Sequence, residues 1–179
     1  LEGGSVNISG GEISHNLANN GNGGGFCIVG GNFNMPDGGN ARIFENATFS
    51  QSNKGGNGGG LYVTSAGSDV TVDILSGSIM DNSSDRVGGG ICVDMTGHEP
   101  SSVTVTVGKA GGDNLNPSIS SNHTIILGGG LYAKGEKANI IINSGRIMDN
   151  TISGYVSNPN VANEGGMVTL NGGDVTHVT

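Results

Sequence analysis

A short glycine box followed by an apolar residue returns at nearly regular intervals along this chain. Copies begin at Gly23, Gly58, Gly88 and Gly128, and a degenerate fifth copy runs from Glu164 to Thr169. Successive copies start 35, 30, 40 and 36 residues apart. A unit of this length with variable insertions is typical of a solenoid, in which every unit packs on its neighbours in the chain.

A second motif, Ile-x-x-Asn, runs in step with the glycine box. Between the two motifs lies an alternating apolar and polar run, such as residues 70–74 or 103–107, which is typical of a strand with one buried face. No stretch of the sequence has the apolar spacing of a helix. Residues 1–179 therefore predict an all-β fold, a parallel β-helix of about five coils with three strands per coil.

The composition suits such a fold and excludes several classes of function. The chain has 36 glycines and no tryptophan, so it has few large side chains with which to fill a globular core. A solenoid does not need them, because its core consists of small aliphatic side chains stacked from coil to coil. A net charge of −8 with seven Lys and Arg residues leaves no basic footprint for nucleic acid. The apolar stretches, such as residues 124–127, are too short to cross a bilayer. We expect no nucleic-acid partner and no membrane insertion by this segment.

Neither end of the sequence has the atypical polar cap that normally closes a solenoid. Residues 1–16 already hold an alternating strand and an Ile-x-x-Asn motif without a preceding glycine box. Residues 165–170 begin a new coil near the other end. We expect a single β-helix segment, residues 1–179, cut from a longer solenoid, and its open ends predict end-to-end self-association. The alternative is a complete domain with degenerate outer coils.

Stacked coils allow the motifs to be compared position by position. The residue after the glycine box and the residue two places later should face the core, and the position between them should face outward. The first inward column is Phe26, Leu61, Ile91, Leu131 and Met167, and the second is Ile28, Val63, Val93, Ala133 and Thr169. The outward column is Cys27, Tyr62, Cys92, Tyr132 and Val168.

The two cysteines share the outward column but lie two coils apart. At a coil spacing of ~4.8 Å their separation is ~9.6 Å, beyond the ~7 Å limit between the Cα atoms of a disulfide. We therefore expect free thiols. We interpret the column as packing beneath a loop, with a ligand-binding surface patch as the alternative.

The asparagine of each Ile-x-x-Asn motif is the most specific polar signal. In a stacked turn each side-chain amide can bond to the one in the next coil, which predicts a hydrogen-bonded ladder. Three of these asparagines also match the N-glycosylation pattern, but a sugar could not be attached inside a ladder. The ladder residues are Asn16, Asn46, Asn82, Asn122 and Asn150.

The residue before each ladder asparagine is the best candidate for chemistry. This acidic column is His15, Glu45, Asp81, Ser121 and Asp149. Carboxylates stacked ~5 Å apart could share a proton or bind a cation such as Ca²⁺, and glycosidases build their sites from carboxylates at similar separations. The alternative is a solvated face that gives solubility and blocks edge association. We assign no catalytic residue and no cofactor, and we expect Glu12 and Arg42 to form a surface ion pair across neighbouring coils.

The two boxes together resemble the repeats of polymorphic outer-membrane proteins, which are right-handed parallel β-helix surface proteins of bacteria. Those repeats pair a Gly-Gly-Ala-aliphatic box with a Phe-x-x-Asn box. Here the boxes are Gly-Gly-Gly-aliphatic, as at residues 88–91, and Ile-x-x-Asn, as at residues 79–82. The likeness covers nearly the whole chain, and the pectate-lyase-like superfamily shares the coil. It implies a right-handed coil and a bacterial cell-surface or secreted segment, often an adhesin, and it transfers no catalytic residue.

We therefore expect a non-enzymatic β-helical adhesin or structural stalk, extracellular or on a cell surface, whose partner is a glycan or a protein ligand. Recognition is expected in the variable insertions, which are Asn32–Asn40, Gly108–Asn116 and Gly154–Asn163. One alternative is a carbohydrate-active β-helix enzyme, either a polysaccharide lyase or a glycosidase. The other is a repeating subunit of an extracellular fibre that continues coil on coil with a neighbour.

Overall fold

The structure, a computed structural model, describes residues 1–51, 55–97, 101–113, 115–153, 161–164 and 167–171. All regular secondary structure in these residues is β-strand, arranged in four parallel sheets that we name A to D. The described residues include no helix long and apolar enough to cross a membrane.

Each sheet takes one strand from every coil. Sheet A contains β1 (Ser5–Asn7), β5 (Gly31–Met35), β9 (Val70–Ile74), β13 (Val103–Val107), β17 (Ala138–Ile142) and β21 (Met167–Leu170). Sheet B contains β2 (Glu12–Ser14), β6 (Arg42–Phe44), β10 (Ser78–Met80), β14 (Ser118–Ser120) and β18 (Arg146–Met148). Sheet C contains β3 (Leu17–Asn19), β7 (Ala47–Phe49), β11 (Ser83–Ser84), β15 (His123–Thr124) and β19 (Thr151–Ile152). Sheet D contains β4 (Phe26–Ile28), β8 (Leu61–Val63), β12 (Ile91–Asp94), β16 (Leu131–Lys134) and β20 (Val161–Glu164).

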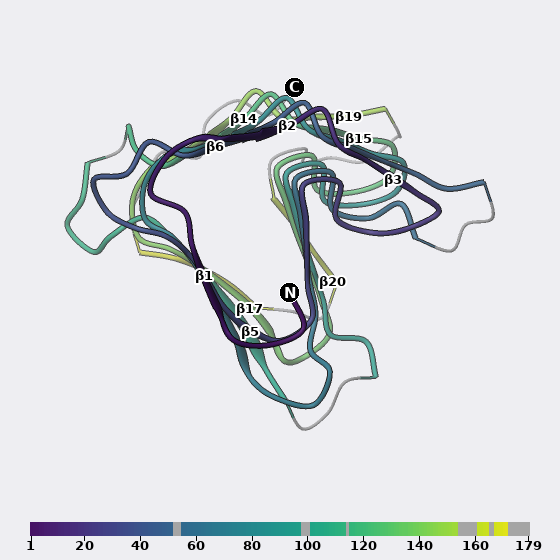
Figure 1. Ribbon diagram of the computed structural model, residues 1–179, viewed down its shortest axis with the longest axis horizontal. Helices are drawn as coiled ribbons and strands as arrows, with labels where there is room; N and C mark the ends of the chain where they lie inside the picture. The colour runs from purple at the N-terminus through teal and green to yellow at the C-terminus, as the bar shows by residue number, and fades with distance from the viewer. Residues whose placement is uncertain (52–54, 98–100, 114, 154–160, 165–166, 172–179) are drawn as a thin grey trace.

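The strands pair in parallel with the strand four places later in the chain, as β5 does with β9 and β9 with β13. Four strands therefore complete a coil, and β21 opens a sixth coil after five complete ones. In Figure 1 the chain runs clockwise from sheet A through B and C to D while successive coils recede from the viewer, which is a right-handed winding. The predicted parallel β-helix is confirmed. In addition to the three predicted strands, each coil has a short fourth strand, in sheet C, formed by the residues after its ladder asparagine.

Aliphatic ladders fill the interior between sheets A, B and D. Ile43, Ile79, Ile119 and Ile147 lie in register on sheet B and are fully buried. On sheet D, Phe26, Leu61, Ile91 and Leu131 pair in the predicted order. Because each side chain stacks on its counterpart, small aliphatic residues are enough to exclude water from the core.

The glycine box is needed because the stacked coils touch there through their main chains. Gly58 has a φ of 67°, in the left-handed region that favours glycine. A Cβ on Gly59 would lie 2.5 Å from the carbonyl oxygens of both Gly89 and Ser83. Stacked main chains thus leave no room for a side chain at the second position of the box.

The prediction for the fifth glycine box is wrong. Residues 161–164 form β20, which pairs with β16 in sheet D. Residues 167–170 form β21, which pairs with β17 in sheet A. Met167, Val168 and Thr169 therefore do not extend the columns of sheet D. The apolar residues of segment 167–170 fit a strand of either sheet. The prediction relied on the spacing of the glycine boxes alone, and this spacing assigned the segment to sheet D instead of sheet A.

Two of the three predicted insertions need adjustment. The segment Asn32–Asn40 begins inside β5, so only residues 36–41 form the turn that follows it. The segment Gly108–Asn116 lies between β13 and β14 and contains no strand among its described residues. In Gly154–Asn163, residues 154–160 lie outside the described part of the chain and the rest belongs to β20.

Candidate functional site

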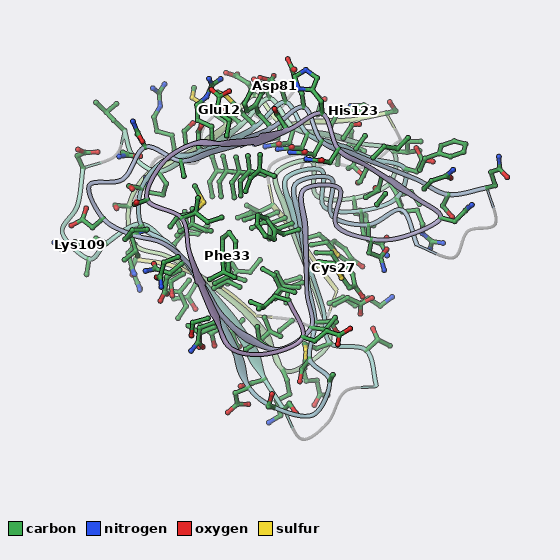
Figure 2. The ribbon with its side chains drawn as sticks, viewed as in Figure 1. Glu12, Cys27, Phe33, Asp81, Lys109 and His123 are labelled. Carbon is green, nitrogen blue, oxygen red and sulfur yellow. The ribbon has the colours of Figure 1, made fainter. Side chains whose placement is uncertain are left out.

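The acidic column lies on an outer corner of the coil, between sheets B and C. All five residues have a left-handed backbone, with φ values from 52° to 59°. This conformation turns the chain at the corner, and all five residues are exposed. Figure 2 shows the side chain of Asp81 projecting away from the coil. The residues are His15, Glu45, Asp81, Ser121 and Asp149.

The arrangement of these side chains is that of a solvated corner. His15 Nε2 lies 2.6 Å from Glu45 Oε2, but the two side chains are 71% and 50% exposed. Ser121 separates Asp81 from Asp149 in the stack. Among the residues that the structure describes, no three His, Cys, Asp or Glu side chains come together in a way that could hold a metal ion. The predicted ion pair beside this column is confirmed, since Arg42 Nη1 lies 2.8 Å from Glu12 Oε1.

The asparagines form the predicted ladder directly behind this corner. Nδ2 of Asn16 donates to Oδ1 of Asn46 at 2.9 Å, and the same bond links Asn46 to Asn82 at 3.0 Å. It continues from Asn82 to Asn122 at 3.0 Å and from Asn122 to Asn150 at 2.9 Å. Each Oδ1 from Asn46 onward also accepts the backbone N–H of the preceding asparagine. One continuous hydrogen-bonded chain therefore fixes this corner through all five coils.

The ladder also explains the matches to the N-glycosylation pattern. Asn46, Asn82 and Asn122 are at most 1% exposed. Both hydrogens of each Nδ2 are used, one on the next asparagine and one on an isoleucine carbonyl oxygen of the preceding coil. The expected structural role of these asparagines is confirmed.

The outward column of sheet D is largely covered. Cys27 is exposed and Cys92 is fully buried, and both are free thiols, as predicted. Burial raises the pKa of the Cys92 thiol and of the Tyr62 hydroxyl, so both groups stay protonated at neutral pH. Tyr132 is almost fully buried and lines the same small recess as Ile126, in the segment after β15. The burial of Cys92 and Tyr132 favours the interpretation as packing over that of a ligand-binding surface patch.

A different candidate site forms where the chain passes from sheet A to sheet B. The turn at this point is long in two coils and short in the coils beside them: it spans residues 36–41 in the second coil, 75–77 in the third, 108–117 in the fourth and 143–145 in the fifth. The two long turns overhang the short turn between them. We name residues 36–41, 108–113 and 115–117, with Leu75 and Ser144, the corner lobe.

An ion pair joins the two long turns across the intervening coil. Lys109 Nζ lies 2.9 Å from Asp37 Oδ2, although the residues are 72 positions apart. Figure 2 shows Lys109 at this outer edge of the molecule. The bond to Lys109 lowers the pKa of Asp37, and the same contact raises the pKa of Lys109. The backbone N–H of Lys109 donates to the buried hydroxyl oxygen of Ser144 at 3.0 Å, which attaches the lobe to the fifth coil.

Asp113 organises the opposite wall of the lobe. Its Oδ1 accepts the backbone N–H groups of Leu115 and Asn116 at 2.9 and 3.0 Å. Its carbonyl oxygen accepts the N–H of Gly145 at 3.2 Å. The walls enclose a recess of about 230 Å³, lined by Asp37, Leu75, Lys109, Asp113, Asn116 and Ser144.

The sequence placed Asp37 and Lys109 in predicted insertions but did not predict that they meet. The available signal was the number of residues between the end of each alternating run and the next Ile-x-x-Asn motif. That number rises in the second and fourth coils and falls in the third and fifth. Long turns on either side of a short one are free to approach each other over it.

The chain matches no model of a known protein family, and no curated protein or solved structure matches it. The parallel solenoid is therefore established by the strand pairing of the chain itself.

Proposed function

We propose that this chain is a non-enzymatic β-helical segment of a bacterial cell-surface or secreted protein, and that it acts as an adhesin built on a rigid stalk. The likeness of its two boxes to polymorphic outer-membrane protein repeats supports this setting. The single observation that carries the binding role is the convergence of two variable turns into one lobe with a polar recess, formed by residues 36–41 and by residues 108–113 and 115–117. Loops positioned by a rigid scaffold are where recognition usually resides.

The stalk role is supported by hydrogen bonds that run along the solenoid axis. All four sheets link coil to coil, and the asparagine ladder adds a buried chain of amide bonds at one corner. A force along the axis would therefore load many parallel bonds at once. Such a segment can hold a binding lobe at a fixed position and orientation.

The placement of the acidic column favours binding over glycan cleavage. A glycosidase places two carboxyl groups on opposite sides of the scissile bond, roughly 5–9.5 Å apart. Glu45 and Asp81 instead stand side by side along one exposed corner. A substrate lying on this corner would meet both carboxylates from the same side.

Immobilised protein tests the proposal directly. Beads coated with the chain should be retained in a saturable way on a glycan array or on a protein-coated surface. The same protein incubated with a panel of neutral and acidic polysaccharides should release no new reducing ends. Cleavage of a polysaccharide that is lost in Glu45→Gln and Asp81→Asn would instead establish the carbohydrate-active enzyme.

A further inference from the structure

The recess of the corner lobe has the dimensions of a small ligand site. Its volume is about 230 Å³, which is below the roughly 300–1,000 Å³ of sites for drug-sized ligands. Four coils line it, since Asp37 comes from the second, Leu75 from the third, Lys109 from the fourth and Ser144 from the fifth. The space suits one compact polar ring better than an extended peptide or polymer.

The walls of the recess combine hydrogen-bond donors and acceptors. The carboxylates of Asp37 and Asp113 accept, and the three N–H groups of the Lys109 ammonium donate. The Asn116 amide does both, while the half-buried Leu75 adds an apolar surface at the floor. A sugar ring matches this mixture, because its hydroxyl groups both donate and accept and one of its faces carries mainly C–H groups.

The charge of the recess argues against an acidic sugar. Lys109 is paired with Asp37, so its positive charge is already balanced. Asp113 then leaves the recess with a negative excess. A sugar carboxylate would meet this excess without a free cation to receive it.

Hydrogen bonds also link the walls of the lobe to the coils beneath it, although the Lys109 and Asp37 side chains are 64% and 57% exposed. The ion pair spans the short turn of the third coil, and the bond from Lys109 N–H to Ser144 Oγ anchors the base of the loop. The bonds to Asp113 set the opposite wall. Backbone bonds of this kind reduce the conformational freedom that the loop would lose on binding.

We propose that the corner lobe binds one uncharged sugar residue, as the terminal unit of a glycan, through Asp37, Lys109 and Asp113 above Leu75. This inference rests on the proposed function as a binding segment. It adds the place of binding and the chemical class of the ligand.

The test titrates the full chain with methyl glycosides of glucose, galactose, mannose and N-acetylglucosamine, and with glucuronic and sialic acid as charged counterparts. Binding is read by saturation-transfer NMR and calorimetry, and a glycan array extends the panel to oligosaccharides. Asp37→Asn and Lys109→Met remove one charged partner each from the lobe. Glu12→Gln and Arg42→Met are the matched controls, because they remove a second exposed ion pair that also joins two coils.

We expect at least one uncharged glycoside to bind, and each lobe variant to weaken that binding by about tenfold or more, as expected when a hydrogen bond to a charged group is lost. The two control variants should stay within about twofold of the wild type, because distant sites act independently. Thermal unfolding of each variant confirms that the fold is intact.

Four results would overturn the inference, and they differ in what they say of the proposed function. If glycans bind equally well to the lobe variants, the recess is not the site but the adhesin proposal stands. If the acidic sugars bind in preference, the ligand class is wrong. If no glycan binds while a protein-coated surface retains the beads, the sugar site is excluded and binding itself survives; retention on neither surface removes both proposals.

Discussion

Replacing Asn82 by alanine removes the middle of the buried asparagine ladder. The Asn82 side chain makes four hydrogen bonds: Oδ1 accepts from the backbone N–H and Nδ2 of Asn46, and Nδ2 donates to the Ile43 carbonyl oxygen and to Asn122 Oδ1. At about 1 kcal/mol for each buried bond, the free energy of unfolding should fall by about 4 kcal/mol. That is a large part of the ~5–15 kcal/mol that stabilises an ordinary domain.

Asn16→Ala is the matched control, because it removes the exposed end of the same ladder. Its Nδ2 donates to Asn46 Oδ1 and to the Ser14 carbonyl oxygen, and the residue is exposed. Solvent replaces such bonds, so we expect a loss below about 1 kcal/mol. Asn82→Leu keeps most of the side-chain volume and should be as damaging as Asn82→Ala, because it also makes none of the four bonds.

Urea unfolding followed by far-UV circular dichroism measures all three variants, with an unchanged slope showing that the same surface is exposed. The reasoning is refuted if Asn82→Ala costs no more than Asn16→Ala. It is also refuted if Asn82→Leu is close to the wild type, because the side chain would then act by filling space rather than by bonding.

Three further outcomes follow from the same contacts. Gly59→Ala should lower the free energy of unfolding by about 3 kcal/mol, because its Cβ would lie 2.5 Å from two carbonyl oxygens. Gly3→Ala is the control: its Cβ would have nothing within 4 Å, so the free energy of unfolding should change by less than about 0.5 kcal/mol. Equal effects of the two substitutions in urea titrations would contradict the close packing of the box. In a thiol-reagent assay on the native protein Cys27 should react and the fully buried Cys92 should react only after unfolding, so rapid modification of both would show that sheet D is not covered. The carboxyl group of Asp37 should titrate below its ordinary value of 3.8 in an NMR pH titration, because Lys109 stabilises its charged form. The stabilisation by this pair is then present above the unfolded pKa and is lost as the pH falls through the lowered value, and Lys109→Met should return the pKa toward 3.8.

The features that could be predicted from the sequence are those that every coil must repeat. The ladder was visible because each asparagine occupies the same corner and bonds to its own copy. The glycine box was visible because backbone meets backbone at Gly59 and at its equivalents. In both cases the same physical constraint acts on every unit, so the residue recurs even where the spacing varies.

The features that could not be predicted depend on single coils or on several coils together. The strand Met167–Leu170 has an alternation that suits sheet A and sheet D equally, and only its pairing with β17 decides between them. The two-residue strand Ser83–Ser84 is too short to carry a periodic signal. The pairing of Lys109 with Asp37 depends on turn lengths in three successive coils, which no single repeat contains.

The stacking of coils can be measured directly through the isoleucine column of sheet B. In protein with labelled isoleucine methyl groups, nuclear Overhauser contacts should link Ile43 to Ile79, Ile79 to Ile119 and Ile119 to Ile147, because these residues face each other in adjacent strands. Ile43 and Ile119 should show no contact, since they lie two coils or ~9.6 Å apart. Missing contacts between successive isoleucines, or contacts that skip a coil, would contradict the parallel β-helix.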